Sequence, residues 1–278
     1  MSTVYGVATC TVGGRVLAVS ASRDKTLRVW DVEAGALRVL EGHTDGVWCV
    51  ATCTAGGRVL VVSGSDDKTL RVWDVEAGTV LKGHTATVYG VAACTVGGRV
   101  LAVSASRDKT LRVWNVEAGT LRTVLEGHTS HVSSVATCTA GGRVLAVSGG
   151  DKTLRVWDVE AGALRTVLEN GVLKTPVEGW VYGVATCTAS GRVLAVSGSQ
   201  DHSVRIWDVG SVAHDEDDDD KEEEEGEGGC SIVGEEEAMD EAEEEDDDDE
   251  VVVNGPRGYR RRGRGVIDDS DGADDDDE

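Results

Sequence analysis

The chain has 278 residues and a formal net charge of −24, but the acidity is confined to one end. Residues 1–213 carry 19 Asp and Glu against 21 Lys and Arg, whereas residues 214–278 carry 32 against 6. No apolar run reaches the length of a membrane span and no export signal is evident, which excludes a membrane-spanning class and predicts an intracellular protein, cytoplasmic or nuclear. We therefore expect a near-neutral domain, 1–213, followed by an acidic tail, 214–278.

A repeated motif organises the first part of the chain. The sequence Asp-Lys-Thr-Leu-Arg-Val-Trp-Asp at residues 67–74 has near-copies whose tryptophans are 43, 41, 43 and 50 residues apart. Self-similarity at this period is typical of repeat architectures, in which each unit is one supersecondary element. The expected repeats are 1–40, 41–81, 82–125, 126–168 and 177–212.

Each repeat predicts four short strands in a row. The first is an apolar segment such as residues 4–8, and the second, such as 59–62, follows a glycine-containing turn. The repeated motif forms the third strand, and a weaker fourth strand is expected at segments such as 120–125. The second strand is apolar on both faces, so sheets must cover it on either side. A four-stranded sheet this small needs neighbours for stability, and we expect the repeats to stack.

The cysteines follow the repeat. Five of the seven occupy one position, at Cys10, Cys53, Cys94, Cys138 and Cys187. No CxxC spacing typical of a metal site is present. Reduced packing thiols are expected, with no metal and no cofactor.

Paired dipeptides identify the family that the repeats resemble. Gly42-His43 stands before Trp73-Asp74, Gly83-His84 stands at the same spacing before Trp114-Asn115, and Gly127-His128 stands before Trp157-Asp158 at a spacing one residue shorter. This pattern resembles the WD40-repeat family over about residues 1–212. The resemblance implies an all-β propeller of about five four-stranded blades.

The first and last repeats depart from the pattern. No Gly-His precedes the first repeat, and the fifth has Pro176-Val177 inside an irregular stretch, 169–180. Three outcomes remain open: a five-bladed ring whose last blade has three strands, an open arc completed by a second chain, or a truncated product. An uncovered blade edge would favour a homo-oligomer, and the strand-like segment 250–254 is another candidate to cover it.

A trio of His, Ser and Asp recurs in three repeats and resembles a catalytic set. No Gly-x-Ser-x-Gly turn exposes a nucleophile, so catalysis is not predicted. The family resemblance implies instead a buried network that also includes the motif tryptophan. Its expected members are His43, Ser63, Asp67, Trp73, His84, Ser104, Asp108, Trp114, His128, Ser148, Asp151 and Trp157.

The family resemblance also implies a partner-binding end, called the top face. One row of positions on it, the second residue of each first strand, holds Tyr5, Trp48, Tyr89, Ser133 and Tyr182. Aromatic and arginine side chains gathered at one place are typical of interaction hot spots. The expected contact residues are Tyr5, Trp48, Tyr89, Trp180, Tyr182, Arg23, Arg107 and His131. The leading interpretation is a non-catalytic protein-protein interaction scaffold for a protein or peptide, and the arginines would suit an acidic or phosphorylated one.

The tail supports an alternative function. Its nearly unbroken acidic runs cannot bury enough apolar surface to fold, so disorder is expected. A tail of this charge would suit a chaperone or assembly factor for basic proteins of the histone or ribosomal type. The Arg/Gly-rich segment 255–265 resembles an RNA-binding segment or a nuclear import signal. The surrounding acid is expected to neutralise it, and nucleic-acid binding is not predicted.

Overall fold

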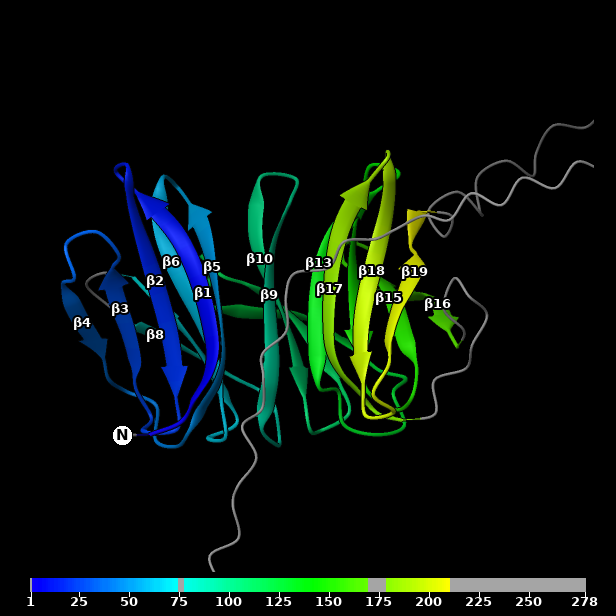
Figure 1. The fold of residues 1–278 in the computed structure, drawn as a ribbon, viewed down its shortest axis with the longest axis horizontal. Coiled ribbons are helices and arrows are strands. Elements are labelled where there is room, and N and C mark those ends of the chain that lie inside the picture. Colours follow the sequence, from blue (N-terminus) through cyan, green and yellow to red (C-terminus); the bar gives the residue numbers. More distant parts are fainter. Residues whose placement is uncertain (1, 75–77, 170–178, 211–278) are drawn as a thin grey trace, which may run out of the picture. The chain divides into compact units, whose positions relative to one another are not determined.

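The computed structural model describes residues 2–74, 78–169 and 179–210, all within the compact unit Met1–Glu222. These residues form strands and turns that make five separate antiparallel sheets (Figure 1). The expected acidic tail, 214–278, and residues 170–178 of the irregular stretch around Pro176-Val177 lie outside the described residues. Within the described ranges, no helix is long and apolar enough to cross a membrane.

We call each sheet a blade and number the blades in chain order. Blade 1 contains β1 (Val4–Val12), β2 (Arg15–Ser22), β3 (Leu27–Asp31) and β4 (Leu37–Leu40). Blade 2 contains β5 (Val47–Ala55), β6 (Arg58–Ser65), β7 (Thr69–Trp73) and β8 (Gly78–Lys82). Blade 3 contains β9 (Val88–Val96), β10 (Arg99–Ser106), β11 (Leu111–Asn115) and β12 (Thr120–Leu125). Blade 4 contains β13 (Ser134–Ala140), β14 (Arg143–Gly149), β15 (Leu154–Asp158) and β16 (Ala163–Leu168). Blade 5 contains β17 (Val181–Ala189), β18 (Arg192–Ser199) and β19 (Val204–Asp208).

Strands that follow each other in the chain are neighbours in the sheet. Blade 1 has the order β1-β2-β3-β4, and each later blade repeats it, except that blade 5 has three strands among the described residues. A two-residue turn joins the first two strands, with Ala55 opposite Arg58 and positive φ angles at Gly56 and Gly57. Two consecutive left-handed residues make the turn that suits a twisted hairpin, and glycine adopts it without strain. The predicted succession of strand, turn and strand is confirmed.

The turn before the third strand explains why its motif begins with Asp-Lys-Thr. One Asp67 carboxylate oxygen accepts hydrogen bonds from the backbone N–H (2.9 Å) and hydroxyl (2.6 Å) of Thr69. Lys68, between them, has a φ of 69°. The aspartate side chain thus accepts a hydrogen bond from a backbone N–H in the turn, where the chain has no strand partner. The third strand begins only at Thr69, so the expected strand over the whole motif is two residues too long at its start.

The blades pack face to face. We call the face of a blade that packs on the next blade its leading face, and the face that packs on the preceding blade its trailing face. Between blades 2 and 3, the leading face contributes Leu60, Val62, Leu70, Val72 and Leu81. The trailing face contributes Val88, Val91, Val100, Trp114 and Val116. Equivalent residues form the clusters between the other neighbouring blades.

The six cysteines of the described residues are free thiols. Cys53, Cys94 and Cys138 lie on the leading faces, where burial raises their pKa to about 11. Cys187 occupies the same position in blade 5 and is exposed. Cys53, Cys94 and Cys138 are therefore protonated near neutral pH and fill space between blades.

Candidate functional site

A β-bulge places the aromatic residues of the first row. In blade 2, Val47 pairs with Ser65 and Cys49 pairs with Gly64, so Trp48 has no partner in the register. The same shift leaves Tyr5, Tyr89 and Tyr182 without register partners. An extra residue in one strand re-aims its side chain out of the alternating pattern of the sheet. In blades 1, 2, 3 and 5 the bulges therefore turn one aromatic side chain each toward the same end of the molecule.

The aromatic side chains form a continuous series from blade to blade. The rings of Tyr5 and Trp48 stack with centroids 4.1 Å apart and planes 11° apart. Trp48 meets Tyr89 edge to face at 5.4 Å, and Tyr89 meets His131 at 6.1 Å. His131 in turn meets Trp180 at 4.4 Å, with planes 83° apart. Stacked and edge-to-face pairs at these distances stabilise one another.

These side chains surround a hollow of about 390 Å³ lined by Tyr5, Trp48, Tyr89, His131, Ser133 and Tyr182. We call the lining residues together with Trp180 the aromatic rim. Two polar atoms in it are buried without a partner among the described residues: the indole Nε1 of Trp48 and the hydroxyl of Ser133. An unpaired buried polar group costs on the order of 1 to 3 kcal/mol, so a ligand that bonds to it would recover that loss.

Backbone hydrogen bonds hold the loops around the rim together. The N–H of Arg23 donates to the carbonyl of Thr3, and the N–H of Arg107 donates to the carbonyl of Thr87, each at 2.9 Å. Equivalent bonds link Asp66 to Gly46 and Gln200 to Trp180. Both arginine side chains are exposed. Burial and the positive charge of Arg107 lower the pKa of His131, which places Arg107 within electrostatic reach of the rim.

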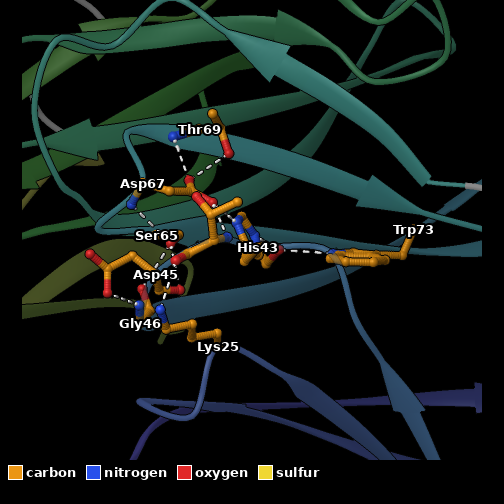
Figure 2. A network of polar contacts seen from close by, with 10 residues as sticks. Lys25, His43, Asp45, Gly46, Ser65, Asp67, Thr69 and Trp73 are labelled. Carbon is orange, nitrogen blue, oxygen red and sulfur yellow. Dashed lines mark hydrogen bonds and ion pairs between the residues drawn. The ribbon is translucent and has the colours of Figure 1, made fainter.

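A second cluster lies inside each of blades 2 to 4. In blade 2 the indole N–H of Trp73 donates to the Ser63 hydroxyl at 2.8 Å, and Ser63 lies 2.8 Å from Nε2 of His43. Nδ1 of His43 lies 2.7 Å from the Asp67 carboxylate, and Figure 2 shows His43 between Asp67 and Trp73. If Nδ1 carries the proton, every polar atom in this series has a partner. The equivalent bonds join Trp114, Ser104, His84 and Asp108, and join Trp157, Ser148, His128 and Asp151.

The electrostatics of this cluster suit a structural network. Burial acts to raise the pKa of Asp67, Asp108 and Asp151, but hydrogen bonds from the histidine and from neighbouring threonines outweigh it and hold each pKa well below its usual range. Burial also lowers the pKa of His84, against the attraction of Asp108. Ser63 is wholly buried, so no substrate reaches its hydroxyl. The cluster has the bonds of a catalytic trio without the access that catalysis requires.

Blades 1 and 5 have the tryptophan and serine of this network without the histidine. Trp30 donates to Ser20 at 3.1 Å and Trp207 donates to Ser197 at 2.9 Å. The turn aspartate pairs with the arginine four residues later, as Arg28 does with Asp24 at 2.9 Å, and blade 4 has this pair beside its histidine, with Arg155 3.6 Å from Asp151. Blade 5 repeats that pair with Arg205 and Asp201 at 2.8 Å.

The structure brings most of the predicted contact residues together. One hollow is lined by Tyr5, Trp48, Tyr89, His131 and Tyr182. Trp180 packs on His131, and the positive charge of Arg107 lowers the pKa of the same histidine. Arg23 is joined to this end only through its backbone. Ser133 was not among the predicted contact residues because it is the one non-aromatic member of its row. Its position in that row was the signal that could have identified it.

The described residues contain no group of three or more His, Cys, Asp or Glu side chains that could hold a metal ion. A comparison with family models matches the WD domain, G-beta repeat, five times, at residues 2–31, 35–74, 76–115, 119–158 and 170–208. No curated protein matches the chain in sequence.

Proposed function

The chain belongs to the WD40-repeat family, and from this we propose that it is a non-catalytic scaffold that binds a protein or peptide partner at the aromatic rim. WD40 repeats in general indicate a protein-interaction scaffold. The observation that carries the proposal is the continuous series of rings across all five blades. Large, rigid rings that border a hollow supply contact area with little loss of conformational entropy, which is why interface hot spots are rich in them.

Two features of the rim indicate the chemistry of the partner. The unpaired Trp48 Nε1 donor favours a partner that presents a hydrogen-bond acceptor, such as a peptide carbonyl. Arg23 and Arg107, both exposed at this end, add attraction for an acidic or phosphorylated side chain. We therefore expect an extended segment whose apolar side chains enter the hollow and whose negative group lies over an arginine.

The test is affinity capture with the full chain and with variants of the rim. The double variant Trp48→Ala and Tyr89→Ala should lose its specific partners, since truncating a hot-spot residue costs on the order of 2 kcal/mol or more, about a 30-fold loss of affinity. Trp48→Phe keeps a large ring but removes the donor, and should give a smaller loss. Arg107→Glu should weaken only partners that carry a negative group.

The matched control is Leu121→Ala with Leu164→Ala. These side chains are also exposed and apolar, but they lie on the outer strands β12 and β16. The control should capture the same proteins as the unaltered chain. A rim variant that still folds and still captures the full set of partners would refute the proposal.

The acidic tail remains a second candidate, because residues 214–278 carry all of the net negative charge, with 32 Asp and Glu against 6 Lys and Arg. Partners bound by the tail would be basic and would be lost as salt is added, since exposed charge contacts are screened. Partners bound at the rim should survive moderate salt and depend on Trp48. If partners are lost as salt is added but are captured equally by the unaltered chain and the rim variants, the tail is the binding region.

A further inference from the structure

Two blade faces in the described part of the chain have no blade against them. On the trailing face of blade 1, Trp30 is 38% exposed, whereas the equivalent tryptophans of the other blades are at most 7% exposed. On the leading face of blade 5, Val204 is 73% exposed, whereas its equivalents, such as Leu70 and Leu111, are completely buried. The exposed apolar side chains of the blade 1 face are Val4, Val7, Val16, Trp30 and Val32.

Glycine positions show the same contrast independently of side-chain exposure. A Cβ placed on Gly64 or Gly149 would lie 2.5 Å from a valine of the next blade. Gly198 is their equivalent in blade 5, and a Cβ there would meet nothing within 4 Å. The leading face of blade 5 therefore has the close-packing surface of an interior blade with its neighbour missing.

The two free faces are the two halves of an interface that occurs four times inside the chain. Residues 11–30, which supply much of the free face of blade 1, are identical to residues 95–114 of blade 3. That segment of blade 3 packs on Leu60, Val62, Leu70 and Val72 of blade 2. The matching positions on the free face of blade 5 are Leu194, Val196, Val204 and Ile206, which differ from those of blade 2 only by exchanges between branched aliphatic residues.

A hydrogen bond between threonines of neighbouring blades could also form between the two free faces. Between blades 1 and 2, the hydroxyl of Thr52 donates to the carbonyl of Thr9 at 2.9 Å. The hydroxyl of Thr186 donates in the same way to the carbonyl of Thr137 at 2.9 Å. On the free faces, the Thr9 hydroxyl of one chain has the position to donate to the Thr186 carbonyl of another, which would set the register between them.

We infer that the chain self-associates head to tail, with the leading face of blade 5 docking on the trailing face of blade 1 of a second copy. The occupant is a second copy because its blade 1 presents the sequence that already packs on such a face within the chain. The missing fourth strand in the described part of blade 5 makes this interface smaller than the interior ones, which also use residues such as Leu81. A contact between two different faces is heterologous, so it produces a closed assembly or an extending one.

The test is sedimentation velocity of the full chain over a wide range of protein concentration. The net charge of −24 makes copies repel each other, so association through apolar faces should strengthen when moderate salt screens that charge. The unaltered chain should form species larger than one chain. Val7→Asp with Val32→Asp alters the blade 1 face, and Val204→Asp with Ile206→Asp alters the blade 5 face; all four side chains are at least half exposed.

Each double variant alone should sediment as a single chain. An equimolar mixture should form a complex of two chains and nothing larger, through the one intact pair of faces, and this rescue also shows that both variants are folded. Leu121→Asp with Leu164→Asp, on exposed outer-strand sites, should associate like the unaltered chain. The inference is overturned if the unaltered chain stays single at every concentration. It is also overturned if either face variant still self-associates, or if the mixture forms no complex.

Discussion

Blades 1 and 3 contain nearly the same sequence in different surroundings. Residues 4–31 differ from residues 88–115 only at Thr9, which is Ala93, and at Asp31, which is Asn115. Trp30 is nevertheless 38% exposed and Trp114 is 1% exposed, and Val16 is exposed where Val100 is buried. The amino acids cannot account for this difference, so the neighbouring blade must.

The comparison shows that the burial of a residue on a blade face depends on whether a neighbouring blade covers that face. Trp114 is buried because blade 2 covers it, and it also belongs to a complete network through Ser104 and His84. Trp30 has only Ser20 as its hydrogen-bond partner and no blade on its face among the described residues. Stability in such repeat arrays is approximately a sum of blade and interface contributions, so equivalent substitutions should cost different amounts.

The largest expected difference in the free energy of unfolding is between the variants Trp114→Ala and Trp30→Ala. Removing Trp114 leaves a cavity in a closely packed cluster and should reduce the free energy of unfolding by about 3 to 5 kcal/mol. Removing Trp30 should cost about 1 to 2 kcal/mol, because much of its surface already contacts water. Chemical denaturation of the full chain, at concentrations where it sediments as one chain, measures both. Equal losses would mean that the trailing face of blade 1 is covered.

A smaller difference in stability is expected between the variants Gly149→Ala and Gly198→Ala. Neither glycine has a positive φ, so alanine is permitted by the backbone at both positions. At Gly149 the added methyl would press on Val181 and should cost about 1 to 2 kcal/mol through overpacking. At Gly198 it meets open space and should be neutral or stabilise by up to about 0.5 to 1 kcal/mol, because glycine is unfavourable within a strand.

Thermal unfolding of the two glycine variants under identical conditions checks this pair. A loss of stability at Gly198 equal to that at Gly149 would contradict an open leading face on blade 5. In the self-associated state, Gly198→Ala should weaken association while leaving the single chain intact, which links this pair of variants to the proposed docking of a second copy.

The smallest effect should be a pH dependence of stability that His84 gives to blade 3 and that blade 1, which lacks this histidine, does not have. Burial lowers the pKa of His84 from 6.5, so the folded protein keeps this imidazole neutral at a pH where the unfolded chain protonates it. The resulting stability is therefore present above pH 6.5 and is lost as pH falls toward the folded-state pKa. The His84→Asn variant should be less stable overall and should lose less stability between pH 7.5 and 5.5, a window chosen about one pH unit either side of the histidine pKa.

Unfolding curves at several pH values, for the unaltered chain and for His84→Asn, measure that slope. Asp108, whose pKa is lowered in the fold, adds a separate loss only below about its ordinary value of 3.8. Identical slopes in the two proteins above pH 5 would show that His84 does not carry the effect. A His202→Asn variant is a suitable control, since that residue lies in the turn of blade 5 and not in the network.

Much of the candidate site was predictable from the spacing of the repeats together with the family resemblance. The dipeptides at residues 42–43 and 73–74, with the family resemblance, predicted the members of the buried network. The family resemblance implied that the row of Tyr5, Trp48 and Tyr89 lies at a common end of the molecule. The β-bulge that turns these side chains toward that end was not predictable, because a bulge depends on how two strands register and not on the residue type at one position.

The sequence by itself determined the interior of each blade. The glycine turn at residues 56–57 and the Asp67–Thr69 turn are closed by residues two or three positions apart, so each repeat specifies its own hairpins wherever it stands. The tertiary structure alone decided which faces are buried and which are free. Burial is a relation between a surface and its neighbour, and identical residues such as Trp30 and Trp114 differ in exposure because a preceding blade lies against only one of them.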